Sequence, residues 1–153
     1  MQMFKIKFLI LCIVFFIINT NLFSKENDYF LTLKNNKVNV RYGPGFDYKI
    51  KYIYKKKNLP ILVIDKKDNF RRIIDFKKNS GWIHRSQLKK GNSLILSNDQ
   101  VLFNGPSKFS KPLAKLLKGR LLIVEKCKKN WCNVKTSDYK GWILNEGNWG
   151  IKK

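Results

Sequence analysis

This 153-residue chain carries the same landmarks twice, in the same order, with an offset that drifts only from 62 to 60 residues. The clearest pair is Gly43-Pro44, which falls on Gly105-Pro106 when residues 36–45 are aligned with residues 98–107. A repeat of this length with internal landmarks predicts two copies of one small domain rather than a solenoid, whose repeats are shorter. Three further pairs follow in register: 60–64 with 120–124, Asn69-Phe70 with Asn130-Trp131, and Gly81-Trp82-Ile83 with Gly141-Trp142-Ile143.

Each copy consists of short apolar runs that are separated by turn-forming residues. Val, Ile, Tyr and Phe dominate the runs, and Gly, Pro, Asn and Asp lie between them. Residues 38–41 alternate like a half-buried strand, and the runs at 59–64, 71–76 and 81–84 are typical of further short strands. Sustained helical periodicity is missing after the N-terminal leader. The pattern predicts an all-β protein with about five short strands per copy, each sheet closing into a small barrel that leaves no exposed edge.

The first 24 residues have the composition of a secretory signal peptide. Lys5 and Lys7 precede an uninterrupted apolar run at residues 8–18, and polar residues follow it. This run is too short for a membrane-spanning helix, which needs about 20 apolar residues. We expect cleavage after Ser24, export to the periplasm or beyond, and no membrane span in the mature chain. An uncleaved interfacial anchor is the alternative. Lipidation at Cys12 is disfavoured because the apolar run continues past it.

The signal peptide at residues 1–24 therefore precedes two domains, which we place at residues 25–90 and 91–153. Lys90-Gly91-Asn92 marks the boundary between them.

Two cysteines remain after the leader, Cys127 and Cys132. Residues 121–125 and 132–135 look like two strands joined by a Lys-Lys-Asn turn, so the cysteines would face each other at a spacing that a disulfide can span. An oxidising compartment favours that bond. A structural zinc site normally needs four ligands, and His84 is the only histidine of the chain. We therefore favour a structural disulfide over a metal or a reactive thiol.

The charge balance is extreme, with 32 Lys and Arg against 10 Asp and Glu and a formal net charge of +22. Such a balance predicts attraction to nucleic acid, anionic lipid headgroups or acidic envelope polymers. Export disfavours nucleic acid, which is scarce outside the cytoplasm. A compositional origin competes with a functional one, because the chain is rich in Lys, Asn, Ile and Phe together, as AT-rich codons would make it.

The ordered landmarks of the first copy resemble the bacterial SH3-like (SH3b) domain. They are the run at 38–45, the Asn69-Phe70 position and the closing Gly-Trp-Ile-His that ends at His84. The second copy resembles, more specifically, a proteobacterial family of exported proteins with two such domains. The residues that carry this second likeness are Cys127, Trp131-Cys132, Gly141-Trp142 and Asn148-Trp149-Gly150.

This resemblance covers essentially the whole mature chain and implies two tandem small SH3-like β-barrels. It also implies a targeting or scaffolding module, because bacterial SH3 domains that have been tested often recognise peptidoglycan peptides. The second copy departs from the pattern at residues 101–104, so Arg41 has no counterpart there. We expect the second copy to bind differently from the first or not at all.

Candidate ligand-binding residues gather beside the Gly43-Pro44-Gly45 turn. Tyr and Arg are frequent anchors of recognition surfaces, and so small a barrel cannot bury all of them. The alternative is that these aromatic side chains pack between the two domains. The candidates are Arg41, Tyr42, Phe46, Tyr48 and Tyr54. Structural roles are expected for Gly43, Pro44 and Gly45 in the turn and for Trp82 and Trp142 in the barrel cores.

No Ser-His-Asp set, catalytic carboxylate pair, phosphate-binding loop or metal-ligand cluster is visible in the sequence. We therefore expect no enzymatic activity, no cofactor and no metal. The expected partner is peptidoglycan or an envelope protein. The alternatives are a basic adaptor for anionic polymers or lipid headgroups, and a purely structural partner of another envelope protein.

Overall fold

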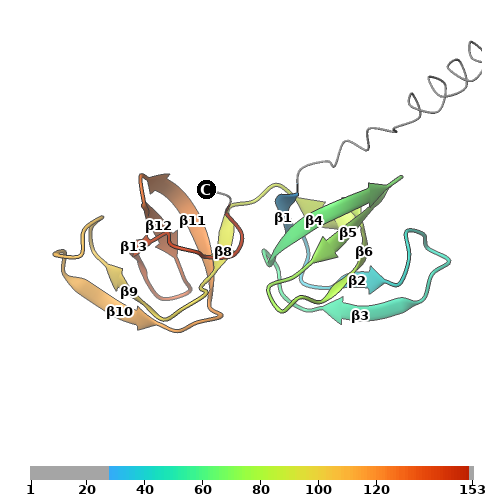
Figure 1. Cartoon of the computed structure of the whole chain (residues 1–153). Helices are drawn as coiled ribbons and strands as arrows, with labels where there is room; N and C mark the ends of the chain where they lie inside the picture. Colours follow the sequence, from blue (N-terminus) through green and yellow to red (C-terminus); the bar gives the residue numbers. More distant parts are fainter. Residues whose placement is uncertain (1–27, 152–153) are drawn as a thin grey trace, which may run out of the picture.

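The computed structural model describes residues 28–151 and contains two antiparallel sheets, one for each copy of the repeat (Figure 1). The signal peptide expected at residues 1–24 lies outside the described residues. The chain passes from the first sheet to the second at residues 90–92. Within residues 28–151, no helix has the length and apolar character of a membrane span.

The first sheet has seven strands in the order β3-β2-β6-β5-β4-β1-β7. A single turn of 3-10 helix, η1 (Arg85–Gln87), leads into its last strand. The strands are β1 (Tyr29–Leu33), β2 (Val38–Arg41), β3 (Ile50–Tyr54), β4 (Pro60–Lys67), β5 (Phe70–Ile74), β6 (Ser80–His84) and β7 (Leu88–Lys89).

The second sheet repeats this arrangement with six strands in the order β10-β9-β13-β12-β11-β8. Where β7 pairs with β1 in the first sheet, Trp149 forms a bridge with Ile95 of β8 in the second. The repeat therefore encodes one strand order twice, and the all-β prediction is confirmed. The strands are β8 (Ser93–Ile95), β9 (Gln100–Phe103), β10 (Pro112–Leu116), β11 (Leu121–Lys128), β12 (Trp131–Lys135) and β13 (Lys140–Leu144).

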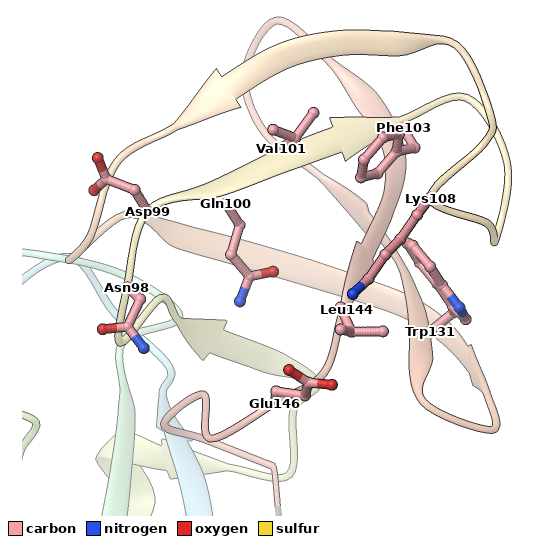
Figure 2. Close-up of a pocket in the computed structure, with 9 residues that line it drawn as sticks. All are labelled: Asn98, Asp99, Gln100, Val101, Phe103, Lys108, Trp131, Leu144 and Glu146. Carbon is pink, nitrogen blue, oxygen red and sulfur yellow. The ribbon is translucent and has the colours of Figure 1, made fainter.

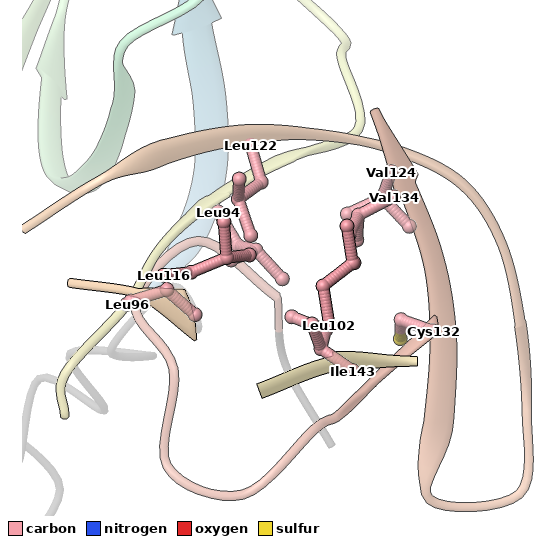
Figure 3. Close-up of a cluster of buried hydrophobic side chains, with 9 residues drawn as sticks. All are labelled: Leu94, Leu96, Leu102, Leu116, Leu122, Val124, Cys132, Val134 and Ile143. Carbon is pink, nitrogen blue, oxygen red and sulfur yellow. The ribbon is translucent and has the colours of Figure 1, made fainter. Parts of the chain in front are cut away.

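Each sheet bends around its own apolar core, and Figure 3 shows the core of the second. Alternate residues of each strand face inward, as the period of two requires. The first core contains Leu33, Val38, Val40, Ile61, Val63, Ile73, Ile83 and Leu88. The second contains Leu94, Leu96, Leu102, Leu116, Leu122, Val124, Cys132, Val134 and Ile143.

The expectation that Trp82 and Trp142 belong to these cores is wrong. Both are half-buried and lie on the opposite face of their strands from Ile83 and Ile143. The glycine before each tryptophan faces inward instead. A Cβ atom on Gly81 would collide with the side chain of Val40 and the carbonyl of Arg41. Glycine therefore lets β6 approach β2 closely, and the alternation then directs the indole outward.

The C-terminal segment of the second domain returns to the first and joins the two through Trp149. Its indole Nε1 donates a hydrogen bond to the carbonyl of Pro60 (3.1 Å). The ring meets Phe30 edge-on at 5.1 Å between centroids, and the ammonium of Lys78 lies 5.4 Å above it. Phe76 of the first domain also meets the Trp149 ring edge-on, at 6.4 Å between centroids. The aromatic residues that pack between the domains therefore include Phe30, Phe76 and Trp149, whereas Tyr42, Phe46 and Tyr48 are exposed.

Candidate functional site

Three outward side chains lie in one row across the first sheet. Arg41 on β2 is paired with Trp82 on β6, and Trp82 is paired with Arg72 on β5. Cross-strand neighbours on one face of a sheet have Cβ atoms about 5 Å apart, so an arginine stands on each side of the indole. A pocket of about 180 Å3 lies over this row and is also lined by Tyr42 and Lys51.

Arg41 uses its guanidinium group to hold the loop that follows β2. Its Nη1 atom donates to the carbonyls of Phe46 (3.1 Å) and Tyr48 (2.6 Å). The guanidinium carbon also lies 5.4 Å from the centre of the Phe46 ring. Because the guanidinium has five N–H donors, this role leaves donors for a ligand, but Arg41 shapes the loop as well as facing the pocket.

Arg72 is the uncommitted cation of the pocket. Its side chain is exposed and makes no hydrogen bond or ion pair with any residue that the structure describes. Lys51, by contrast, donates to the carbonyl of Ser80 (2.9 Å) and lies 5.6 Å above the Tyr42 ring. Sequence reasoning missed Arg72 and Lys51, because their place beside Trp82 depends on strand register, which no motif of the sequence carries.

The loop after β2 packs its aromatic rings against its own domain. The Phe46 ring contacts Phe70 and His84, with centroids 5.2 and 5.1 Å apart, although two-thirds of Phe46 is exposed. The Tyr48 ring lies directly against Gly43 and leaves no room there for a Cβ atom. Gly43 does not have a positive φ, so the loop needs this glycine for close approach rather than for an unusual backbone angle.

Tyr54 lies apart from the other candidates. It is paired with Val38, at the opposite end of β2 from Arg41. Its hydroxyl donates to the buried carboxylate of Asp75 (3.0 Å) and lies 3.4 Å from the hydroxyl of Tyr52. Burial, as the largest cause, raises the pKa of Tyr54 well above its ordinary value. The structure therefore brings together Arg41, Tyr42, Phe46 and Tyr48, and it places Tyr54 in a separate hydrogen-bonded cluster.

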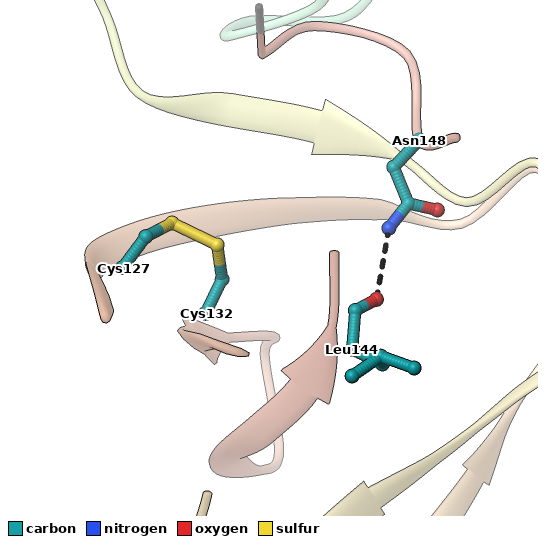
Figure 4. The surroundings of a disulfide bond; sticks show 4 residues. All are labelled: Cys127, Cys132, Leu144 and Asn148. Carbon is teal, nitrogen blue, oxygen red and sulfur yellow. Dashed lines mark hydrogen bonds between the residues drawn. A yellow bond between two sulfur atoms is a disulfide. The ribbon is translucent and has the colours of Figure 1, made fainter. Parts of the chain in front are cut away.

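The disulfide joins Cys127 and Cys132, which face each other across the β11–β12 hairpin with Cα atoms 4.1 Å apart (Figure 4). The predicted pairing is confirmed. Cys132 belongs to the second core, so the bond ties the exposed end of the hairpin to buried structure. Within residues 28–151, no group of three or more His, Cys, Asp and Glu side chains is placed to hold a metal.

The model of the bacterial SH3 domain matches residues 34–90 of this chain and matches again at residues 97–150. The chain belongs to the bacterial SH3 domain family. No protein among the curated sequences matches it. The solved structures of NlpC2 and NlpC1 from Trichomonas vaginalis are similar at 13% identity and a TM-score of 0.36 each, over 82% of this chain. This chain spans about half of their length, 49% and 47% respectively.

The second SH3 domain keeps the tryptophan of the row but neither of the two arginines, and the ammonium of Lys126 lies 5.8 Å over the Trp142 ring instead. Phe103 is paired with Trp142, and Trp142 is paired with Asn133. With its amide oriented to satisfy both partners, Asn133 accepts from the Trp142 indole (3.2 Å) and donates to Glu125 (3.0 Å). Phe103 and Asn133 thus stand where the first SH3 domain has Arg41 and Arg72, so the two domains present different chemistry at equivalent positions.

Proposed function

We propose that this bacterial SH3 protein is an exported, non-catalytic module that binds peptidoglycan, or another carboxylate-bearing envelope component, through the pocket of its first domain. The observation that carries the proposal is the uncommitted guanidinium of Arg72 beside the exposed edge of Trp82. Peptide stems of the cell wall carry free carboxylates, and arginine binds a carboxylate through two parallel hydrogen bonds. Trp82 offers a flat apolar surface next to that charge.

Three other properties support this assignment. Domains of this family often bind cell-wall material. A hairpin disulfide is typical of proteins that fold in an oxidising compartment. The charged start and apolar run at residues 1–24 have the composition of an export signal.

Co-sedimentation with purified peptidoglycan sacculi tests the proposal. We expect Arg72→Lys to weaken binding about tenfold although the charge is kept, because lysine cannot form the paired hydrogen bonds. Arg85→Lys is the matched control, since Arg85 is exposed in the same domain but does not line the pocket. The pocket assignment is wrong if Arg72→Lys sediments with sacculi as the parent does.

The net charge of +22 favours a second candidate, a basic adaptor held by anionic polymers or lipid headgroups. The salt dependence of binding distinguishes the adaptor from the pocket-binding module. Binding that rests on neutralised charges falls steeply with ionic strength, whereas binding in a pocket is less sensitive. If moderate salt releases the parent, Arg72→Lys and Arg85→Lys equally from sacculi, the adaptor is the better description.

A further inference from the structure

A groove of about 340 Å3 opens on the second domain between β9, the end of β13 and the loop after β9 (Figure 2). Its floor is apolar and consists of Phe103, Trp131 and Leu144. The Phe103 and Trp131 rings meet edge-on with centroids 5.8 Å apart. This groove is separate from the proposed peptidoglycan pocket, which lies on the first domain.

In the first domain, the equivalent groove is filled by a side chain of the same domain. Strand register places Trp131 and Leu144 at the positions of Phe70 and His84. In the first domain, the loop after β2 fills the space over those two residues with the ring of Phe46. The equivalent groove of that domain is thus occupied by an aromatic side chain of its own chain.

The second domain lacks both the ring and the group that holds it. Counted from the Gly-Pro pair, Lys108 stands at the position of Phe46. Phe103 replaces Arg41, so no guanidinium ties the loop down as Arg41 does through the carbonyls of Phe46 and Tyr48. The side chain of Lys108 lines the groove in place of that ring (Figure 2). Because this side chain is long and flexible, a ring supplied from outside can displace it and pack on the aromatic floor.

The polar groups around the groove include hydrogen-bond acceptors and one cation, Lys108. Among the described residues, Glu146 has no hydrogen-bond or ion-pair partner, whereas Asp99 is paired with Lys115 at 3.4 Å. The Oε1 atom of Gln100 is buried and accepts no hydrogen bond from the described part of the chain. Buried polar atoms normally have a partner, and the first domain has the core residue Val38 at the position of Gln100. An amide at this position leaves a buried acceptor beside the groove.

We propose that this groove binds a partner peptide by one aromatic side chain, which takes the place that Phe46 fills in the first domain, with a cationic residue next to it facing Glu146. The free carboxylate of Glu146 favours a positive charge on the ligand. The open aromatic floor provides apolar surface for the ring.

The test uses three acetylated and amidated tetrapeptides, Gly-Phe-Lys-Gly, Gly-Ala-Lys-Gly and Gly-Phe-Glu-Gly. Each is titrated into the full chain while the indole N–H resonance of Trp131 is followed by NMR, with Trp131→Phe to assign the signal. We expect saturable shifts with Gly-Phe-Lys-Gly, about tenfold weaker binding when Phe is replaced by Ala, and weaker binding when Lys is replaced by Glu.

Variants of the groove give a second measurement. Lys108→Phe restores the residue of the first domain, so it should fill the groove and lower affinity for Gly-Phe-Lys-Gly at least tenfold without unfolding the chain. Lys135→Phe is its matched control, since it makes the same change at an exposed position outside the groove. Glu146→Gln should weaken binding of Gly-Phe-Lys-Gly by two- to fivefold. It should not weaken binding of Gly-Phe-Glu-Gly.

Two results would overturn the proposal. One is equal affinity of the parent for Gly-Phe-Lys-Gly and Gly-Ala-Lys-Gly, or equal affinity of the parent and of Lys108→Phe for Gly-Phe-Lys-Gly. The other is a shift of the Trp131 signal with protein concentration alone. In that case the fully exposed ring of Phe109 on a second copy would be the occupant.

Discussion

At the scale of single residues, two of the glycines that mark the repeat are required by close contact and not by a positive φ. Gly43 and Gly81 are needed because a Cβ atom at either position would collide with a neighbour. Arg41 similarly serves packing first, since it ties the carbonyls of Phe46 and Tyr48 to β2. A residue chosen from sequence as a ligand contact is thus also a support for the loop that carries the other contacts.

Tyr54 provides a test of a structural residue. Its hydroxyl donates to Asp75, so Tyr54→Phe should lower the free energy of unfolding by about 1 kcal/mol. Because the pKa of Tyr54 is raised on folding, its contribution is complete below pH 10 and falls as the pH rises above that value.

Urea unfolding between pH 8 and pH 11 measures both effects, because the stability gap between the parent and Tyr54→Phe should narrow above pH 10. Sacculus binding by the variant should equal that of the parent. If Tyr54→Phe binds sacculi more weakly but unfolds with the same free energy as the parent, Tyr54 is a binding residue after all.

At the scale of strands, the sequence predicts best those strands in which apolar and polar residues alternate and which end in clear turns. The Gly-Trp strands and the β11–β12 hairpin with its facing cysteines are of this kind. The end strands β3 and β10 are hard to predict from local pattern, because most of their residues are exposed.

The candidate site was predicted only in part for a related reason. Arg41 and Tyr42 adjoin a recognisable turn, and the structure places both at the pocket. Arg72 reaches the same pocket through its pairing with Trp82. That pairing depends on long-range register, which local pattern does not specify.

The β11–β12 hairpin should depend measurably on its disulfide. Cross-linking so short a loop stabilises a fold by about 2 kcal/mol through chain entropy. The reduced protein should therefore melt at a lower temperature than the oxidised protein, with the same circular dichroism spectrum. Comparing the two redox forms avoids the core cavity that a substitution of the buried Cys132 would create. Labelling of both cysteines in the native, unreduced protein would contradict the bond.

At the scale of the whole molecule, Trp149 links two similar domains, because it belongs to the sheet of one and packs on the other. Its backbone pairs with Ile95 (2.8 and 3.0 Å), and its side chain contacts Pro60 and Phe30. The hydroxyl of Ser93 adds a hydrogen bond to the carbonyl of Asn58 (2.7 Å). The contacts of Trp149 thus join its own domain to the other through both its backbone and its side chain.

Trp149→Ala should therefore uncouple the domains. We expect the parent to unfold in a single calorimetric transition and the variant to unfold in two, with a loss of about 2–3 kcal/mol at the interface. Trp149→Phe is the control, because it keeps a ring against Phe30 and removes the hydrogen bond to Pro60. Two transitions in the parent would show that the domains already unfold independently.

The Trp149 contact also determines how two occupied sites would cooperate. The loop between β2 and β3 and the loop between β9 and β10 lie at opposite ends of the molecule (Figure 1). Avidity for a single ligand requires that both sites can reach it at once, and oppositely directed loops prevent this for any short ligand. If both proposed sites are occupied, the chain therefore holds two separate short ligands at opposite ends of the molecule.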